Sequence, residues 1–174
     1  VDKKQAKRVA RTAGMLLRQC AEIWDLDGPL SPNILDWAAR LHEIGLDISH
    51  DGYQRHGAYI AENADLPGFP RAEQRFLAFL IGSQRHSINT KFLGILPRGW
   101  REHALRLTLL LRLAVLLNRS RSALEIPDIV VSVGERSIDL KFDGEWLRAN
   151  PLTIADLDRE IGDAKDVGYE LTFS

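Results

Sequence analysis

The stretch Trp37-Ala-Ala-Arg-Leu-His-Glu-Ile-Gly-Leu46 decides the fold of this 174-residue sequence. It places a His-Glu pair, His42 and Glu43, at the end of a predicted helix, directly before a short apolar turn that contains Gly45. An imidazole and a carboxylate at a helix end can reach one divalent cation from the last turn. Such pairs are also common on helix surfaces, so the residues on either side determine how this one is interpreted.

Apolar residues at helical spacing predict five helices around this stretch. The predicted ranges are 2–24, 31–44, 51–63, 71–86 and 100–119. In the first helix we expect the apolar residues, Ile23 among them, to share one face, with Lys and Arg residues around the other. Gly and Pro separate the helices, as at Gly28-Pro29 and at residues 66–70. The sequence therefore predicts a mostly α fold.

The pattern changes at Pro127. Two β-rich runs, 129–133 and 137–142, flank Gly134-Glu135-Arg136, which is typical of a hairpin. A helix at 153–165 and a last strand at 168–173 would complete a small β-β-α-β unit. We therefore expect two domains, a helical domain at residues 1–124 and a small acidic α+β subdomain at residues 125–174.

Charge is distributed unevenly along the chain, whose formal net charge is −1. Residues 71–121 hold ten Lys/Arg against the acids Glu73 and Glu102, a charge of +8, whereas residues 128–174 hold eleven acids against five Lys/Arg, a charge of −6. A concentrated basic stretch raises the local concentration of anions. The charge pattern alone is equally consistent with a polyanionic partner and with a solvated arginine face.

Composition is typical of a globular protein from a reducing compartment. The one Cys, Cys20, argues against a disulfide framework, and its apolar neighbours predict a buried side chain. The sequence shows no secretory signal, and its longest apolar run, 105–117, is too short to span a bilayer and contains two arginines. We expect a cytoplasmic protein that is, at most, peripheral to a membrane.

The order of residues resembles that of the HD superfamily, in which a helix ends in His-Asp before an apolar-Gly turn. The matching residues are Val9-Ala10, His42-Glu43, His56, His86 and Leu113-Ala114. The resemblance implies four metal ligands, and three positions depart from it: Gln5 replaces a His, Glu43 replaces an Asp, and Val115 replaces the distal Asp. We therefore expect an HD-like helical bundle with a degenerate metal position at His42 and Glu43, no bound metal and no catalytic residue.

A more specific resemblance covers essentially the whole chain. The segments 41–45, 56–60, 63–69, Arg85-His86 and 110–118 are similar to the carboxy-terminal region of bacterial exopolyphosphatases and of the related guanosine pentaphosphate phosphatases. In that family an amino-terminal pair of actin-like domains, absent here, carries the catalytic machinery. The resemblance implies that this half contributes a dimer contact and part of a basic channel for polyphosphate. It also implies Mg²⁺ for the whole enzyme and no cofactor in this half.

Seven basic residues are the candidate ligands of inorganic polyphosphate: Arg55, His56, Arg85, His86, Arg101, Arg112 and Arg119. Arg101, Arg112 and Arg119 share one helix face, because separations of eleven and seven residues are close to whole turns, and they would span roughly 27 Å. Arginine offers a fork of donors that matches phosphate oxygens. The other four candidates, Arg55, His56, Arg85 and His86, would lie close together if the bundle brings the third and fourth helices together. Arg106 points elsewhere and is expected to be ordinary surface.

Three functions stay open. The leading expectation is the polyphosphate-binding and dimerising half of an exopolyphosphatase, in which the amino-terminal catalytic domains of the same chain remove terminal phosphate. The second is an active HD-type metal phosphohydrolase on a nucleotide such as guanosine pentaphosphate, with one metal among His42, Glu43, His56 and His86. The third is a purely structural dimerisation scaffold. No nucleic-acid partner is expected, because aromatic residues such as Tyr59 and Phe79 lie among apolar neighbours and are predicted to be core.

Overall fold

The structure is a computed structural model that describes residues 1–122 and 125–174. Its helices are α1 (Lys3–Cys20), α2 (Leu30–Leu41), α3 (Tyr53–Asn63), α4 (Arg71–Gly82), α5 (Arg98–Leu117), α6 (Gly144–Ala149) and α7 (Pro151–Asp166), with the short 3-10 helices η1 (Ile44–Asp47) and η2 (Thr90–Ile95) and the strands β1 (Val130–Gly134), β2 (Ser137–Lys141) and β3 (Glu170–Phe173). The predicted mostly α fold with a small α+β subdomain is confirmed. The predicted domain boundary after residue 124 falls at residues 123–124, outside the described residues.

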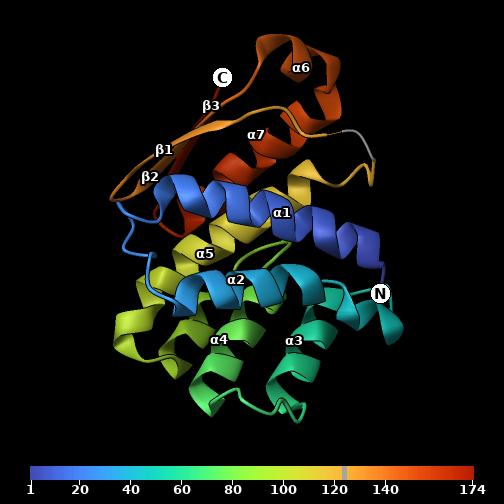
Figure 1. The fold of residues 1–174 in the computed structure, drawn as a ribbon, viewed down its shortest axis with the longest axis vertical. Helices are drawn as coiled ribbons and strands as arrows, with labels where there is room; N and C mark the ends of the chain where they lie inside the picture. Colours follow the sequence, from blue (N-terminus) through green and yellow to red (C-terminus); the bar gives the residue numbers. More distant parts are fainter. Residues whose placement is uncertain (123–124) are drawn as a thin grey trace.

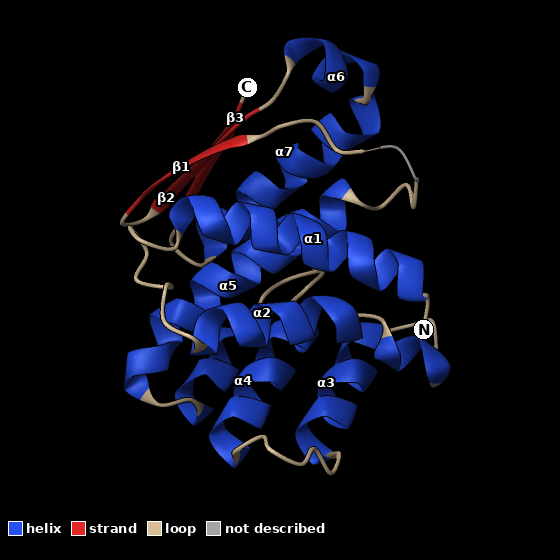
Figure 2. Cartoon of the chain, in the orientation of Figure 1, coloured by secondary structure: helices blue, strands red, loops and turns tan. Residues whose placement is uncertain are grey.

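Helices α1 and α5 cross the middle of the molecule (Figure 1). Helices α2, α3 and α4 lie on one side of this pair, and the sheet with α6 and α7 lies on the other. Figure 2 shows that the strands occupy one corner of an otherwise helical molecule. The buried apolar residues nevertheless form one cluster that runs from the bundle into the β subdomain. None of the described helices is both long enough and apolar enough to cross a membrane.

Helix α1 begins at a side-chain cap and ends earlier than predicted. The carboxylate of Asp2 accepts hydrogen bonds from the backbone nitrogens of Lys4 and Gln5 at 3.0 and 3.1 Å, which satisfies two donors that the first turn leaves unpaired. After Cys20 the chain turns, and this turn buries Trp24 but exposes Ile23. The prediction that Ile23 lies on the buried face is therefore wrong, because the helical periodicity does not continue to that residue.

Gly45 fixes the turn that follows the His-Glu pair. A Cβ atom at this position would lie 1.8 Å from the carbonyl oxygen of Tyr53, so only glycine lets η1 approach α3 this closely. Helix α3 in turn packs against α4 through Gly57, where a Cβ atom would lie 2.9 Å from Cγ2 of Ile81. These close approaches hold the end of α2 and the start of α3 next to α4.

The β subdomain has the predicted β-β-α-β order, with the short helix α6 in addition. Strands β1 and β2 pair antiparallel across the turn at Glu135-Arg136, as predicted, and β3 pairs parallel to β2 after the crossover through α7. Ile138, Leu140 and Leu171 are buried, and they alternate with more exposed neighbours as a half-buried sheet requires. The sheet order is β1-β2-β3.

Side chains of α1 and of the turn after it bond part of the outer edge of β1 and the end of this strand. The Gln19 amide donates to the carbonyl oxygen of Ile129 at 2.9 Å and accepts from the backbone nitrogen of Val131 at 3.0 Å. The indole nitrogen of Trp24 donates to the carbonyl oxygen of Gly134 at 2.8 Å. These bonds attach the β subdomain to α1.

Arg106 of α5 is a second link between the helical bundle and the β subdomain. Its guanidinium donates to the hydroxyl of Tyr169 at 3.0 Å, to the carbonyl oxygen of Trp24 at 3.2 Å and to that of Glu135 at 2.8 Å. It also lies over the Trp24 ring, 5.4 Å from the centroid. The prediction that Arg106 is ordinary surface is therefore wrong, because the acceptors that bury it come from segments distant in sequence.

Candidate functional site

The degenerate metal position lies at the end of α2, where the chain enters η1. His42 and Glu43 are both buried there. The Nδ1 of His42 donates to the carbonyl oxygen of Ala39 at 2.6 Å, and its Nε2 lies 3.3 Å from Oε1 of Glu43. The imidazole thus bridges the last turn of its own helix and the neighbouring carboxylate.

The cation that compensates Glu43 is Arg121. Its Nη2 lies 2.7 Å from Oε1 of Glu43, and its Nη1 lies 3.2 Å from Oδ2 of Asp2. The hydrogen bond from His42 and the contacts with Arg121 outweigh burial and lower the pKa of Glu43 to about 2. Arg121 reaches this place with a left-handed backbone, φ 54°, a conformation that a non-glycine residue adopts only at a cost.

The residues present at this position do not fit a divalent metal. The Gln5 amide, where the HD pattern has a His, donates to the carbonyl oxygen of Asn118 at 2.8 Å and accepts from Arg8. Within residues 1–122 and 125–174, no three His, Cys, Asp or Glu side chains are placed to hold a metal ion. His56, a proposed ligand of the hydrolase alternative, lines neither of the two cavities described below. We therefore derive no metal-dependent step for this chain.

Arg112 does not belong to an exposed arginine ridge. Its side chain is 5% exposed, and all three guanidinium nitrogens are engaged: Nε with Glu160 at 2.8 Å, Nη2 with Asp163 at 2.9 Å and Nη1 with the carbonyl oxygen of Ser83 at 2.7 Å. Burial raises the pKa of Glu160 even though Arg112 opposes that shift. Helix α7 therefore covers Arg112 with carboxylates, and this residue does not face solvent as a phosphate ligand would.

Arg119 and Arg101, the other two residues predicted on that ridge, lie in different surroundings. Arg119 follows the end of α5, is 56% exposed and pairs with Asp156 of α7 at 2.7 Å. Arg101 donates to the carbonyl oxygens of Leu96 and Gly94, both at 3.2 Å, and so braces the segment before α5. Of the three residues that helical periodicity placed on one face, Arg112 and Arg119 line the second cavity described below, and Arg101 lines neither cavity.

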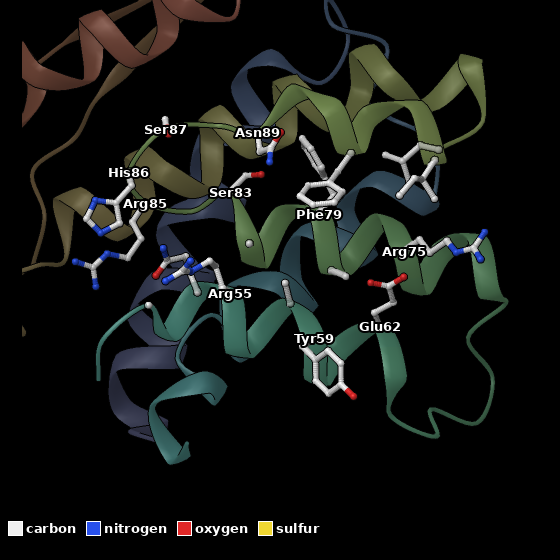
Figure 3. A pocket seen from close by; sticks show the side chains of 18 of the residues that line it. Arg55, Tyr59, Glu62, Arg75, Phe79, Ser83, Arg85, His86, Ser87 and Asn89 are labelled. Carbon is white, nitrogen blue, oxygen red and sulfur yellow. The ribbon is translucent and has the colours of Figure 1, made fainter. Parts of the chain in front are cut away.

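The other predicted group, on the third and fourth helices, lines a cavity of about 630 Å³ between α3, α4 and η2. Arg55, Arg85 and His86 lie together at one end of this cavity, and Glu62 and Arg75 lie at the other (Figure 3). His56, on the same helix as Arg55, is half-buried and does not line it. The structure thus brings three of the four predicted residues together.

Arg85 and His86 are held in place by local features. The guanidinium of Arg85 stacks over the ring of Tyr53, 4.7 Å from its centroid, and His86 adopts a left-handed backbone with φ 59°. Neither Arg55 nor Arg85 forms an ion pair within the part of the chain that the structure describes. Apolar side chains such as Phe79 and Phe92 line the same cavity, and Tyr59 beside them is 67% exposed, contrary to the prediction that it is core.

A second cavity, of about 550 Å³, surrounds the degenerate metal position. Arg85 and His86 line it as well, so these two residues join the two cavities. Its other arginines are Arg112, Arg119, Arg121 and Arg159, and each of these is paired with an acidic side chain. The second cavity therefore contains many charged groups, but acidic side chains of the same chain already neutralise most of its arginines.

Sequence reasoning missed Arg75, Arg121 and Arg159. Arg75 lines the first cavity, and the other two line the second. Both Arg75 and Arg121 lie in the basic stretch 71–121, which was the only signal in the sequence that could have pointed to them. No sequence pattern signalled Arg159, which lies on the acidic helix α7.

Comparison with known proteins matches nearly the whole chain to one family. The sequence model described as "Ppx/GppA phosphatase, domain III" matches residues 1–161. Proteins named guanosine-5'-triphosphate,3'-diphosphate pyrophosphatase are similar to the chain: one from Vibrio cholerae is 36% identical over 99% of it, one from Photobacterium profundum 35% over 98%, and one from Vibrio vulnificus 33% over 98%. The chain spans about a third of the length of each of these relatives, 34% in all three.

Proposed function

Because the chain belongs to the Ppx/GppA phosphatase family, whose domain III it matches, we propose that it holds the phosphate chain of a polyanionic substrate, inorganic polyphosphate. Hydrolysis of the terminal phosphate and the Mg²⁺ that it needs are assigned to amino-terminal domains of the whole protein, which the family resemblance implies. The proposal also includes a cytoplasmic homodimer as the assembled state. This chain supplies binding rather than the chemical step.

The main support for this proposal is which arginines already have an acidic partner and which do not. In the second cavity Arg112, Arg119, Arg121 and Arg159 already have carboxylate partners, whereas Arg55 and Arg85 in the first cavity form no ion pair among the described residues. A guanidinium without a carboxylate binds phosphate without first breaking an ion pair. The end of the first cavity is therefore the favoured place for phosphate.

The shape of this end also suits a chain of phosphates. Arg55 comes from α3, and Arg85 and His86 follow the end of α4, so their donors approach from different elements (Figure 3). The stacking on Tyr53 restrains the Arg85 side chain, which reduces the entropy lost when it binds a phosphate oxygen. His86 contributes one hydrogen-bond donor when neutral and two when protonated.

The test is the affinity of the 174-residue chain for a long, fluorescently labelled polyphosphate across a salt series. Arg55→Gln with Arg85→Gln should weaken binding at least about tenfold, because two charged hydrogen-bond donors to phosphate are lost. The matched control is Arg18→Gln with Arg148→Gln, which removes the same charge from two exposed arginines that line neither cavity. Equal affinities of the two double variants would contradict the proposal and favour a structural scaffold.

Guanosine-5'-triphosphate,3'-diphosphate is the second candidate ligand, because the names of the relatives specify it. The observation in its favour is the apolar part of the first cavity, where Phe79 and Phe92 could face a base while Arg55 and Arg85 bind phosphates. Competition separates the two candidates. If this nucleotide displaces labelled polyphosphate and inorganic tripolyphosphate at equal concentration does not, the base contributes and the nucleotide is the better ligand.

A further inference from the structure

We propose that Asp156 of α7 is an internal counterion that competes with the phosphate chain for Arg119 and Arg159, and so sets how long a chain must be to bind across both cavities. This inference rests on the proposed function, because it concerns the same phosphate-binding surface. Helix α7 would thus regulate the affinity for polyphosphate in addition to packing against α5.

Asp156 is placed between two arginines that are much more exposed than it is. Its carboxylate lies 2.7 Å from Nη1 of Arg119 and also pairs with Arg159, one turn further along α7. The Asp156 side chain is 10% exposed, whereas those of Arg119 and Arg159 are 56% and 74% exposed. One partly buried carboxylate therefore neutralises two cations that face solvent at the second cavity.

Arg85 and His86 line both cavities, so the two cavities adjoin each other at these residues. A phosphate chain held by Arg55 and Arg85 therefore passes the edge of the second cavity if it continues beyond His86. The basic side chains at that cavity include Arg119 and Arg159. A long chain reaches them, and a short anion held at the end of the first cavity does not.

The Asp156 pairs can be exchanged for phosphate, whereas the Arg112 pairs cannot. Arg119 and Arg159 are exposed at the second cavity, so solvent and salt screen their pairs with Asp156, and an anion with several charges can reach both guanidiniums and compete with the carboxylate. Arg112 and Glu160 are each 5% exposed, and separating them would leave buried charges without partners. The competition therefore involves Asp156 and leaves the buried part of the α5–α7 contact intact.

The experiment compares Asp156→Asn with Asp158→Asn in the same chain. Both variants remove one negative charge from α7, but Asp158 is exposed and lines neither cavity. Asp156→Asn should raise the affinity for long polyphosphate about threefold to tenfold and leave the affinity for inorganic tripolyphosphate unchanged within about twofold. Asp158→Asn should change both affinities by less than about twofold.

A reversal experiment identifies the cations that are released. In the Asp156→Asn background, Arg119→Gln with Arg159→Gln should abolish the gain for long polyphosphate. A gain that survives these two changes, or an equal gain in Asp158→Asn, would overturn the inference. Thermal unfolding checks that each variant is folded. If Asp156→Asn does not fold, Asp156→Ser replaces it.

The outcomes also separate this inference from the function on which it rests. Binding of long polyphosphate by the unaltered chain with no gain in Asp156→Asn would overturn the inference alone. No binding by the unaltered chain, even at low salt, would overturn the proposed function and the inference together.

Discussion

The Nη2 atom of Arg121 lies 2.7 Å from Oε1 of Glu43, and this contact joins the segment after α5 to the end of α2. The same guanidinium bonds Asp2, the cap of α1, so one side chain connects three helix ends. In an HD-type site a metal cation would balance the carboxylate at this position. Here the balancing charge belongs to the chain itself, which makes the position part of the fold rather than a place for exchangeable ions.

Acid should weaken the fold through Glu43. His42 and Arg121 lower its pKa from 4.5 to about 2, so between these values the folded chain binds fewer protons at this group than the unfolded chain does. The stabilisation, on the order of 3 kcal/mol, is fully present above pH 4.5 and is lost as the pH falls toward 2. Urea unfolding at about pH 6 and about pH 3 measures this loss. Glu43→Gln should show a smaller loss, and an equal loss in both proteins would assign the effect to other carboxylates.

The buried pair of Arg112 and Glu160 should behave as a coupled unit. Arg112→Met alone leaves the buried Glu160 without its partner and should lower the free energy of unfolding by about 3–5 kcal/mol. Glu160→Met alone should cost less, because Asp163 still pairs with Arg112. The double variant should be clearly more stable than the sum of the two losses predicts, because neither buried charge remains. Urea unfolding of the four proteins gives the coupling energy. Additive losses would show that the two side chains contribute independently.

His86→Gly should raise stability and lower affinity for polyphosphate. Glycine adopts the left-handed backbone of residue 86 without the strain of a Cβ atom, and we expect a gain of up to about 1 kcal/mol in thermal unfolding. The phosphate-binding end of the first cavity loses one donor in the same variant. Asp25→Gly is the control, because Asp25 is also left-handed, φ 57°, but lines neither cavity. A similar loss of affinity in both variants would contradict a role of the imidazole.

Gly45→Ala should destabilise the chain strongly. The new methyl group would lie 1.8 Å from the carbonyl oxygen of Tyr53, and the backbone must move to relieve this overlap, at a cost of about 3 kcal/mol or more. Gly94→Ala is the matched control, since a Cβ atom there meets nothing within 4 Å. Denaturant midpoints of the two variants test the prediction, which fails if they differ by less than the error of the measurement.

Helical periodicity predicted the order of the helices and the β-β-α-β subdomain, because burial of one face repeats at fixed spacing along each element. It could not predict the bends between elements. The first helix stops at Cys20 rather than near Trp24, and the fourth at Gly82 rather than near His86. In both places the chain turns at or near a left-handed residue, Asp25 or His86, whose conformation has no signature in the sequence.

The candidate site was predicted in part. Periodicity gives the direction of a side chain around its own helix but not what covers that face, so Arg101, Arg112 and Arg119 were grouped although α7 buries one of them. The carboxylates of Glu160 and Asp163 that cover Arg112 come from a helix 48 or more residues further along. Arg55, His56, Arg85 and His86 were grouped on the expectation that an HD-like bundle brings the third and fourth helices together, and all of them except His56 line the first cavity.

The edge of β1 has a consequence for how copies of this chain can meet. An exposed strand edge offers unpaired N–H and C=O groups to any other extended segment, and proteins that leave such an edge open tend to aggregate. Gln19 already bonds two of these groups, the carbonyl oxygen of Ile129 and the N–H of Val131, and Trp24 bonds the carbonyl oxygen of Gly134 at the end of the strand. The side chains act as a substitute for a neighbouring strand, so another molecule cannot extend the sheet here without first displacing them.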